Sequence, residues 1–503
     1  MRILLIRPPV PRHAIGLKHI MICEPLELEY VAAGLEGHEV EIFDMIIERG
    51  LEGRLQQFRP EVVGTSSYIT GVNEVKKLCR KVKRWNPSCL TLVGGVHASC
   101  VPEDFSDGAV DTIVRGDGTS VMPELVETIR AGRPLQSIPG LAFPRGDGSV
   151  QVSGERPYMP DPDSLPFPRR DLVARLRHRY YYLFHQPVAT MKTTWGCWYD
   201  CSFCFPSRVT GGITYSRSPQ SIVEELGQIE EEEEVYIVDD IFLFNSKRLL
   251  EIAQLLRDQR IRKKYLVYGR ADFVAEHEGI IREWADLGLT AVIMGLEAAT
   301  DEELASMNKK CTVDNNCRAV EILRKYGIDT YASLIPQPDY VDRDWKRLQT
   351  FIEKNNLYYV NLSPLTPLPG TRIWDEYKDR ITVSRRAHGL WDLSHCVVPT
   401  RMPLRRYYRS LLKLYVRTVL NVYRAQRLTL RTRPPVWSVK YLRLWWGAFR
   451  ILLQFLNAHR HHSPQELRRA MDKGPEITLI NPRHRSLTSV HQAIQSGNLG
   501  GAR

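Results

Sequence analysis

Three cysteines carry the strongest chemical signal in the sequence. Cys197, Cys201 and Cys204 have the spacing Cys-x3-Cys-x2-Cys, and the next cysteine along the chain is Cys311. Three thiolates on one short loop can converge on a metal, and soft sulfur ligands favour iron–sulfur clusters or zinc. Structural zinc normally takes four protein ligands, and no fourth cysteine or histidine is near this loop in the sequence. The spacing therefore predicts a [4Fe-4S] cluster with one iron open to an external ligand.

An alternation of strands and helices must position this loop. The expected strands are Val188–Thr193, Val235–Asp239, Leu266–Arg270, Ala291–Gly295, Tyr331–Ile335 and Tyr358–Leu362, with helices near 218–230, 245–259, 277–287, 314–326 and 342–355. Six β/α units of this kind predict a partial TIM-type barrel, (β/α)6, with its chemistry at the carboxyl ends of the strands. The cysteine loop directly follows the first of these strands, at that end of the barrel.

The cysteine spacing in this context resembles the radical S-adenosylmethionine (SAM) superfamily. The resemblance implies that the open iron chelates the amino and carboxylate groups of SAM, which an electron from the cluster cleaves to a 5′-deoxyadenosyl radical. It also implies SAM contacts at successive strand ends, from Asp239, Asp240, Arg270 and Glu297. A carboxylate at a strand end can instead be a helix cap or a salt-bridge partner. One departure from the superfamily is the loop 334–338, where relatives often carry a glycine and this chain has none.

Residues 1–135 also alternate strand and helix. The expected strands are Ile3–Ile6, Val40–Phe43, Val62–Ser66, Leu90–Val93 and Thr112–Val114. This pattern indicates βαβ units and a parallel, Rossmann-like sheet, in which ligands bind beyond the carboxyl ends of the strands. Polar and small residues follow two of these strands, namely Ser66, Ser67, Gly94, Gly95 and His97.

Ahead of such a barrel, these residues resemble the cobalamin-binding domains of the methyltransferase branch of the superfamily. The resemblance implies cobalamin contacts from Ser66, Ser67, Gly94, Gly95 and His97. The Asp-x-His-x-x-Gly motif that ligates cobalt is missing, because Asp44-Met45-Ile46 has isoleucine in place of the histidine. Cobalamin is therefore expected in the base-off form without a histidine lower ligand. The alternatives are a generic nucleotide-type fold that uses Gly-Gly as a tight turn, and a purely structural role for His97.

Composition and charge narrow the class of protein. The chain has 503 residues, 43% of them hydrophobic and 25% charged, which excludes a collagen, a disulfide scaffold and a wholly disordered chain. Ten cysteines are too few to build a disulfide framework in a chain of this length. Because the sequence shows neither a signal-peptide core nor a long apolar run, the expected location is the cytoplasm. Residues 380–503 contain 23 lysines and arginines against four acidic residues, a local net charge of +19 that leaves −8 on the rest. The basic part favours an anionic partner.

The basic C-terminal part is also rich in aromatic residues. Residues 437–456 read WSVKYLRLWWGAFRILLQFL, which gives an apolar helical face with a cationic edge. This composition is typical of a helix that lies in a membrane interface, and one interpretation is peripheral contact with the inner face of the membrane. The alternative is a pair of helices that cap the barrel, and nucleic acid is the least favoured partner.

The sequence thus predicts an α/β protein with five parts. These are a cobalamin-binding domain (1–135), a proline-rich linker (136–187), a radical SAM barrel (188–378), a helical basic domain (379–482) and a disordered tail (483–503). The resemblance implies a cobalamin-dependent radical SAM methyltransferase that methylates an unactivated carbon of a small, hydrophobic substrate and takes electrons from a flavodoxin- or ferredoxin-type donor. Two alternatives remain open, an oxidation or cyclisation without methyl transfer, and a non-catalytic cobalamin or iron–sulfur sensor.

Overall fold

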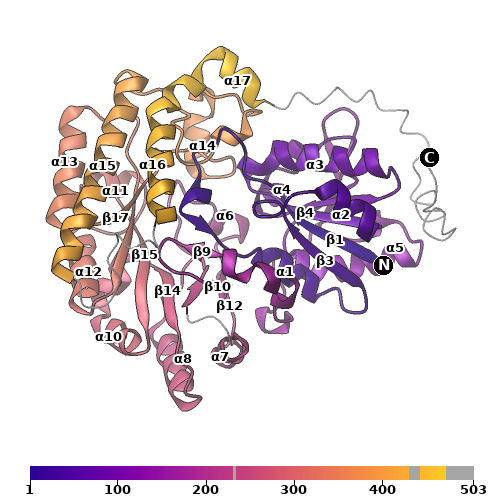
Figure 1. Cartoon of the computed structure of the whole chain (residues 1–503), viewed down its shortest axis with the longest axis horizontal. Helices are drawn as coiled ribbons and strands as arrows, with labels where there is room; N and C mark the ends of the chain where they lie inside the picture. Colours follow the sequence, from indigo (N-terminus) through magenta and orange to yellow (C-terminus); the bar gives the residue numbers. More distant parts are fainter. Residues whose placement is uncertain (230–233, 430–441, 472–503) are drawn as a thin grey trace.

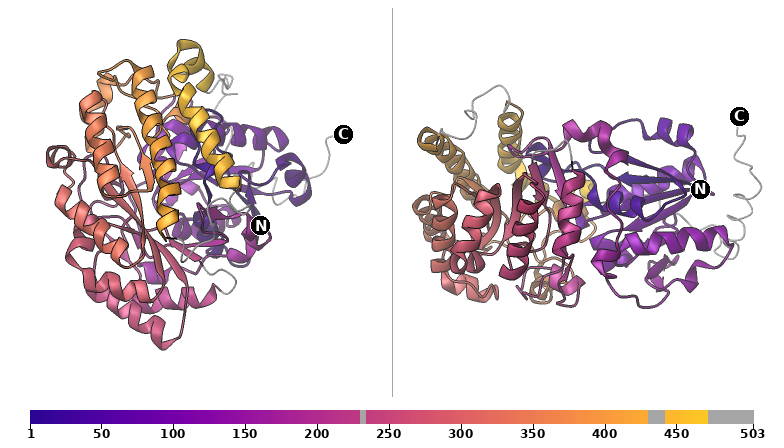
Figure 2. Two further views of the ribbon diagram at one scale, coloured as in Figure 1. Left: turned by 60° about the vertical axis from the view of Figure 1, so that its left-hand side comes forward. Right: turned by 90° about the horizontal axis from the view of Figure 1, so that it is seen from below.

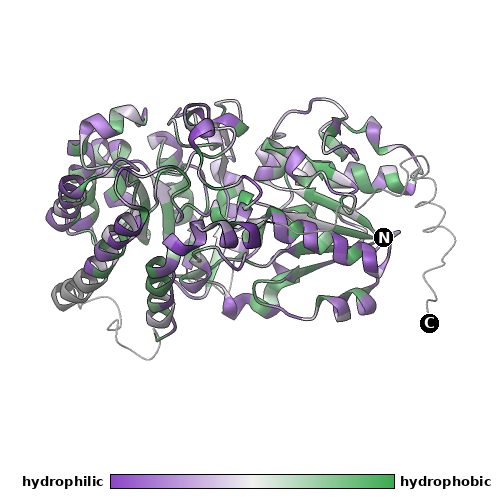
Figure 3. Cartoon of the chain, turned by 90° about the horizontal axis from the view of Figure 1, so that it is seen from above, coloured by the Kyte–Doolittle hydropathy of each residue, from purple (hydrophilic) through white to green (hydrophobic). Residues whose placement is uncertain are grey.

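Two α/β units lie side by side in the chain, and helices near the C-terminus cover one of them (Figure 1). The computed structural model describes residues 1–229, 234–429 and 442–471. In each unit the strands are mostly hydrophobic and the surrounding helices present polar faces outward (Figure 3). The predicted tail at 483–503 and the start of the predicted interfacial helix, 437–441, lie outside the described residues.

The N-terminal unit is built on a seven-stranded sheet with the order β3-β1-β4-β5-β6-β7-β8. Its strands are β1 (Arg2–Arg7), β3 (Glu39–Asp44), β4 (Val62–Ser66), β5 (Leu90–Gly94), β6 (Thr112–Val114), β7 (Leu141–Pro144) and β8 (Val150–Val152). The first five are parallel. Helices α1 (Leu26–Ala33), α2 (Leu51–Phe58), α3 (Val72–Trp85), α4 (Val96–Cys100) and α5 (Gly118–Arg130) connect them. Strand β1 is buried on both faces, since Ile3 and Leu5 pack in one apolar cluster and Leu4 and Ile6 in another, as expected for a parallel sheet covered on both sides.

Residues 136–187, expected as a linker, are partly a component of this sheet. Strand β7 pairs antiparallel with β6, and β8 pairs antiparallel with β7. The many prolines concealed this hairpin in the sequence, because proline inside a run argues against a central strand, whereas here Pro144 stands only at the end of β7. Farther along, the short strand β9 (Tyr181–Tyr182) pairs with β2 (Met21–Ile22) of the N-terminal unit. The segment therefore extends the N-terminal sheet before it leads into β10 of the barrel.

The second unit is an open barrel of six parallel strands with the order β10-β13-β14-β15-β16-β17. The strands are β10 (Val188–Met191), β13 (Glu234–Ile237), β14 (Lys264–Gly269), β15 (Leu289–Glu297), β16 (Asp329–Leu334) and β17 (Tyr359–Leu362). The helices around them are α7 (Pro219–Gln228), α8 (Ser246–Asp258), α9 (Ala271–Glu276), α10 (Glu278–Asp286), α11 (Asp301–Ser306), α12 (Val313–Lys325), α13 (Asp342–Lys354) and α14 (Arg372–Tyr377). All six strands coincide with the expected ones to within a few residues.

The C-terminal part adds α15 (Leu404–Thr429), α16 (Leu442–Asn457) and α17 (Pro464–Ala470). Helices α15 and α16 lie side by side on the outside of the barrel (Figure 2). They also contribute to the main core, because Tyr407, Tyr408 and Phe455 are fully buried in it. None of the helices in the described part of the chain has the length and apolar character needed to cross a bilayer.

Candidate functional site

The cysteine loop leaves the barrel directly after β10 and runs to the short helix α6 (Pro206–Val209). Its entry turns at Gly196, whose φ is +82° and where a Cβ would lie only 2.3 Å from the Ile213 carbonyl oxygen. Only glycine fits this turn. The Gly196 amide donates a 2.8 Å hydrogen bond to Asp240 Oδ2. The sequence Gly196-Cys197 therefore forces the loop back across the barrel mouth, with its first cysteine held next to the end of β13.

The three thiols are arranged for a group larger than one ion. Their sulfur atoms do not all lie within 4.8 Å of one another. Among the described residues, the only three histidine, cysteine or acidic ligand atoms that do so lie elsewhere and include none of these cysteines. The thiolates of one tetrahedral zinc ion would lie about 3.8 Å apart, given Zn–S bonds of about 2.3 Å. Burial raises the pKa of both the Cys197 and Cys204 thiols, so a positively charged metal group is needed to hold them as thiolates. This donor set fits an iron–sulfur cluster.

Strand alternation separates the two predicted carboxylates at the end of β13. Tyr236 and Val238 belong to the cluster inside the barrel, whereas Val235 and Ile237 pack against the outer helices. Because successive side chains point to opposite faces, Asp240 continues the inner series. Its side chain lies 3.6 Å from Lys192 Nζ and is partly exposed at the barrel mouth.

Asp239 is buried and its carboxylate is fully engaged. Oδ1 accepts hydrogen bonds from the amides of Thr193 and Thr194 at 2.6 and 3.0 Å, and Oδ2 accepts one from the Thr193 hydroxyl at 2.5 Å. These bonds fix the backbone immediately before the cysteine loop. In the structure Asp239 therefore positions the loop, and a contact between Asp239 and SAM stays a prediction.

Arg270 lies against the cysteine loop. Its guanidinium carbon is 3.6 Å from the centre of the Tyr199 ring, and Nη1 is 3.9 Å from Cys201 Sγ. Nε and Nη2 donate to the carboxylate of Asp272. The arrangement puts a permanent positive charge beside the sulfur of Cys201, where it would offset the negative charge of a thiolate.

Glu297 forms a buried ion pair, which is the salt-bridge role considered for strand-end carboxylates, with Lys309 as a partner that the sequence did not indicate. Its Oε1 accepts a 2.7 Å hydrogen bond from Lys309 Nζ, and both side chains are less than 10% exposed. A Cβ on Gly295 would lie 2.1 Å from Glu297 Oε1, so the glycine provides the space that the carboxylate occupies. Burial alone would lower the pKa of Lys309, but the Glu297 charge raises it above its ordinary value. Lys309 also lies close enough to Cys204 to lower the pKa of that thiol.

On the N-terminal unit, the predicted cobalamin loops follow β4 and β5. The Ser66 hydroxyl donates to Glu27 Oε1 at 3.3 Å, and the buried Ser67 hydroxyl donates to the Tyr68 carbonyl oxygen at 2.8 Å. Gly95 has a φ of +98°, and a Cβ there would lie 2.7 Å from the Ser67 amide nitrogen. Glycine is therefore needed at position 95 because the loop after β4 lies so close, whether or not a ligand binds there. Gly94 has no such close neighbour.

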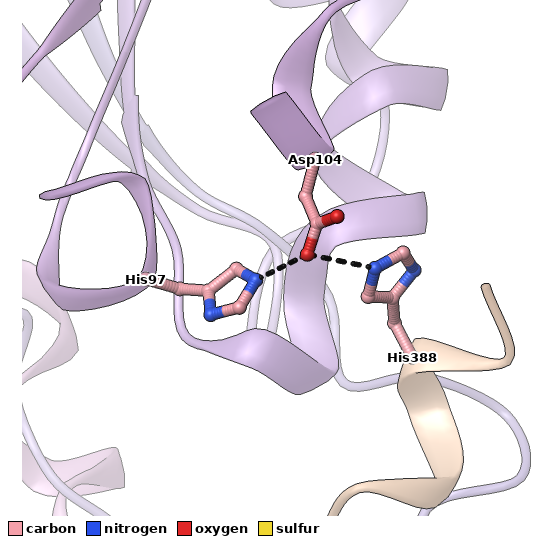
Figure 4. A group of neighbouring side chains, drawn as sticks. All are labelled: His97, Asp104 and His388. Atoms are coloured by element: carbon pink, nitrogen blue, oxygen red, sulfur yellow. Dashed lines mark hydrogen bonds and ion pairs between the residues drawn. The ribbon is translucent and has the colours of Figure 1, made fainter. Parts of the chain in front are cut away.

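His97 is buried in α4 and points away from these loops. Its Nε2 lies 2.8 Å from Asp104 Oδ2, in a group with His388 from the C-terminal part of the chain (Figure 4). The structure therefore gives His97 a protein partner, and its contact with cobalamin stays a prediction.

The loops of the two units lie close together, since the Tyr30 ring of α1 is 6.2 Å from the Trp195 ring that precedes Cys197. Tyr68 is 64% exposed, yet desolvation raises its pKa, with Glu27 and Asp240 as the next causes. Glu27 belongs to α1 and Asp240 to the barrel mouth, so Tyr68 lies near both units. Glu27, from α1, behaves in the same way, since it is exposed and desolvation raises its pKa. Burial and then the Asp240 charge raise the pKa of Tyr158, so this residue also lies close to the barrel mouth.

Tyrosine rings pack together inside the barrel. The set comprises Tyr182, Tyr236, Tyr268, Tyr331 and Tyr359. The Tyr182 and Tyr331 rings stack 5.8 Å apart, and the Tyr236 and Tyr268 hydroxyls lie 2.7 Å apart. The Tyr236 and Tyr268 hydroxyls satisfy each other, the Tyr331 hydroxyl bonds with His185 Nε2, and the rings form an aromatic floor inside the barrel. The sequence offered no signal for Tyr68, Tyr158 or Lys309, because none of them belongs to a motif.

Comparison with known proteins agrees with this division of the chain. Residues 12–126 match the B12 binding domain family, and residues 191–352 match the radical SAM superfamily. The hopanoid C-3 methylase of Methylococcus capsulatus is 33% identical over 402 residues, which cover 78% of this chain and 75% of that protein.

Two solved structures share the fold. The radical SAM methyltransferase TsrM of Kitasatospora setae, with cobalamin and a [4Fe-4S] cluster bound, has a TM-score of 0.60 at 20% identity and covers 75% of this chain and 78% of its own. The cobalamin-dependent SAM radical enzyme OxsB, with aqua-cobalamin and SAM bound, has a TM-score of 0.67 at 14% identity and covers 99% of this chain and 79% of its own.

Proposed function

This chain belongs to the cobalamin-binding radical SAM family of methyltransferases, and we propose that it transfers a methyl group to an unactivated carbon of a hydrophobic substrate. The cofactors of the family are cobalamin, a [4Fe-4S] cluster and SAM. Cys197, Cys201 and Cys204 would hold the cluster, and Asp240, Arg270 and Glu297 are the charged residues beside it at the barrel mouth. Ser66, with the loops after β4 and β5, would border the cobalamin.

These cofactors supply the radical chemistry and the methyl group when they are bound. The protein supplies position and charge. Asp239 and Asp240 hold both ends of the turn before Cys197, and Arg270 with Lys309 keeps positive charge next to the thiolates. The observation that carries the proposal is that the loops of the two units meet, with Tyr30 of α1 against Trp195 beside the cysteine loop, and with Tyr68 placed so that burial, then Glu27 and then the Asp240 charge raise its pKa.

The aromatic floor of the barrel supports a hydrophobic substrate, because ligand sites are lined mainly by apolar and aromatic side chains that match the ligand. The relative named a hopanoid methylase suggests a polycyclic lipid, and we include this class among the substrates to be tested. The test is an anaerobic incubation of the reduced holoenzyme with a polycyclic triterpenoid and SAM that carries a trideuterated methyl group. Product that gains the deuterated methyl group supports the proposal. Oxidised or cyclised product without the label would remove methyl transfer to this substrate.

We propose a flavodoxin- or ferredoxin-type protein as the electron donor. The support is the exposed surface beside the cysteine loop, where Trp198 is 44% exposed and the side chains of Arg208 and Lys310 reach solvent. Small electron-transfer proteins of this type are acidic and would be attracted to such a surface. In the R208E/K310E variant the KM for reduced flavodoxin should rise several-fold, while turnover with a chemical reductant stays unchanged. An unchanged KM would contradict this docking site.

We further propose that α16 binds the surface of an anionic membrane. One of its faces packs on the core through Leu444, Gly447 and Phe455. The opposite face carries an exposed apolar stripe, formed by Leu442, Trp446, Phe449, Leu453 and Leu456 at 44–61% exposure. Their spacing of three and four residues aligns them on one side of the helix. A row of large exposed apolar side chains marks an interaction surface. In this proposal one face of α16 covers the barrel and the opposite face contacts the membrane.

Charge next to the stripe argues for a membrane. Arg405 and Arg409 of α15, with His459 and Arg460, line a small cavity of about 190 Å³ that also contains Leu456 from the stripe. No carboxylate in the described residues pairs with these three arginines, and all three lower the pKa of His459. Unpaired cations beside an apolar helical face suit anionic lipid headgroups.

The R405E/R409E variant tests the role of charge. It should reduce sedimentation with vesicles of phosphatidylglycerol at least ten-fold relative to the parent chain, whereas vesicles of phosphatidylcholine should bind both proteins weakly. Equal sedimentation of the two proteins would contradict the membrane proposal. A concentration-dependent dimer in solution that the variant abolishes would instead assign the surface to a second copy of the chain.

A further inference from the structure

Three side chains from distant parts of the sequence converge beside the N-terminal unit. His97 comes from α4, Asp104 from the 3-10 helix Pro102–Phe105, and His388 from the 3-10 helix His388–Leu390. Both Nε2 atoms face the same carboxylate oxygen, with His97 Nε2 at 2.8 Å and His388 Nε2 at 3.4 Å from Asp104 Oδ2 (Figure 4). The two histidines are 6% and 3% exposed. In the described part of the chain, no other three ligand atoms of this kind lie so close together.

Hydrogen bonds fix the orientation of His388. The Asn73 amide nitrogen donates to the carbonyl oxygens of Arg386 and Ala470. The Asn73 oxygen therefore faces His388 Nδ1, 2.9 Å away, and because a carbonyl oxygen only accepts, Nδ1 must donate the proton. A neutral His388 ring then carries a lone pair on Nε2. This is the arrangement by which an outer partner prepares a histidine to bind a metal.

The prepared lone pair has no hydrogen-bond partner. His388 Nε2 is buried and forms no hydrogen bond of acceptable geometry, although Asp104 Oδ2 is its nearest polar neighbour. Two acceptor atoms 3.4 Å apart repel each other unless a cation lies between them. A buried polar atom without a partner costs about 1–3 kcal/mol. An ion bound to Nε2 would remove this cost.

We propose that His97, Asp104 and His388 form a binding site for a divalent transition-metal ion, with zinc as the best match. Two imidazoles and one carboxylate are ligands that zinc accepts, and three protein ligands leave one position for water. With bonds of about 2.0–2.1 Å, tetrahedral ligand atoms lie about 3.3 Å apart, so small side-chain movements would complete the site. Arg385 lies 3.3 Å from the other oxygen of Asp104 and orients the carboxylate toward the histidines.

The site would fasten two parts of the chain together. His97 and Asp104 belong to the unit with the cobalamin loops, and His388 belongs to the segment that leads from the barrel to α15. An ion that bridges them would stabilise this junction without taking part in methyl transfer, and the proposal does not depend on the proposed function.

Zinc content of the full-length, cluster-loaded protein tests the proposal. The protein is dialysed anaerobically against micromolar zinc and passed over a desalting column, and zinc, iron and cobalt are then measured in the same sample. We expect about one zinc per chain in the parent protein, a loss of at least ten-fold in His388→Gln and Asp104→Asn, and no change in the matched control His277→Gln. The retained iron and cobalt show that a variant is folded.

Thermal denaturation of the parent chain gives an independent measurement. Because an ion that binds only the folded state raises its stability, zinc should raise the unfolding midpoint and EDTA should lower it. The proposal is overturned if the parent chain retains no zinc and its midpoint does not respond to zinc. It is equally overturned if His388→Gln and Asp104→Asn, with iron and cobalt retained, bind as much zinc as the parent chain.

Discussion

Replacing Trp446 and Phe449 by serine should weaken binding to anionic vesicles by roughly 50- to 100-fold. The two side chains are 60% and 48% exposed on the apolar stripe of α16. Aromatic side chains bury about 150–250 Å² when fully enclosed, so this pair presents roughly 200 Å² to solvent. At about 25 cal/mol per Å² its complete transfer from water contributes about 5 kcal/mol. A helix in the interface buries about half of that area, which leaves about 2.5 kcal/mol, or nearly two orders of magnitude in the partition constant.

The assay is co-sedimentation with phosphatidylglycerol vesicles over a range of lipid concentrations. The matched control is the L250S/V152S variant, which removes two exposed apolar side chains, 45% and 41% exposed, from α8 and β8. The control should bind as the parent chain does. Point variants are required because a truncation at residue 380 would remove Tyr407 and Tyr408 from the core. A partition constant for W446S/F449S within three-fold of the parent value would refute the reasoning.

Three further predictions concern packing, charge and pH. In Gly447→Ala the new Cβ would lie 2.1 Å from the His19 carbonyl oxygen, so the free energy of unfolding should fall by about 1–3 kcal/mol, seen as a lower midpoint in differential scanning fluorimetry. The control Gly279→Ala, which has open space around it, should be neutral or stabilising. Glu297→Gln leaves Lys309 buried without its charged partner and should lower the free energy of unfolding by about 3–5 kcal/mol. The double variant E297Q/K309M should regain most of this stability, and equal unfolding midpoints for the single and double variants would contradict the ion pair. Burial, followed by the neighbouring His395, lowers the pKa of His461 to about 4, from 6.5. The neutral folded ring therefore contributes stability that is complete above pH 6.5 and is lost as the pH falls towards 4, and His461→Gln should flatten the thermal stability profile over this range.

The fold could be predicted from the sequence wherever periodicity determines it. The six barrel strands and five parallel N-terminal strands are short apolar runs between amphipathic helices, and this pattern has one main solution. The hairpin β7–β8 could not be predicted, since its residues are few, partly polar and surrounded by proline. Its position depends on pairing with β6, which is a tertiary contact.

The candidate site was predictable only where local spacing encodes it. The three cysteines share one loop, and Gly196 is required by a turn within that loop. Lys309 and Tyr68 come from other elements and reach the site through packing, so their sequence context holds no signal. The difference between Asp239 and Asp240 was in principle readable from strand alternation, because the inner series runs through Tyr236 and Val238.

The central claim is that Cys197, Cys201 and Cys204 hold a cluster on which SAM is cleaved. The most direct test is to measure iron and 5′-deoxyadenosine in anaerobically prepared parent protein and in the C197A/C201A/C204A variant, with bound cobalamin as the indicator of folding. We predict about four irons per chain and 5′-deoxyadenosine formation in the parent protein, and neither in the variant, which should still bind cobalamin. A variant that retains its iron, or one that still releases 5′-deoxyadenosine, would contradict the assignment.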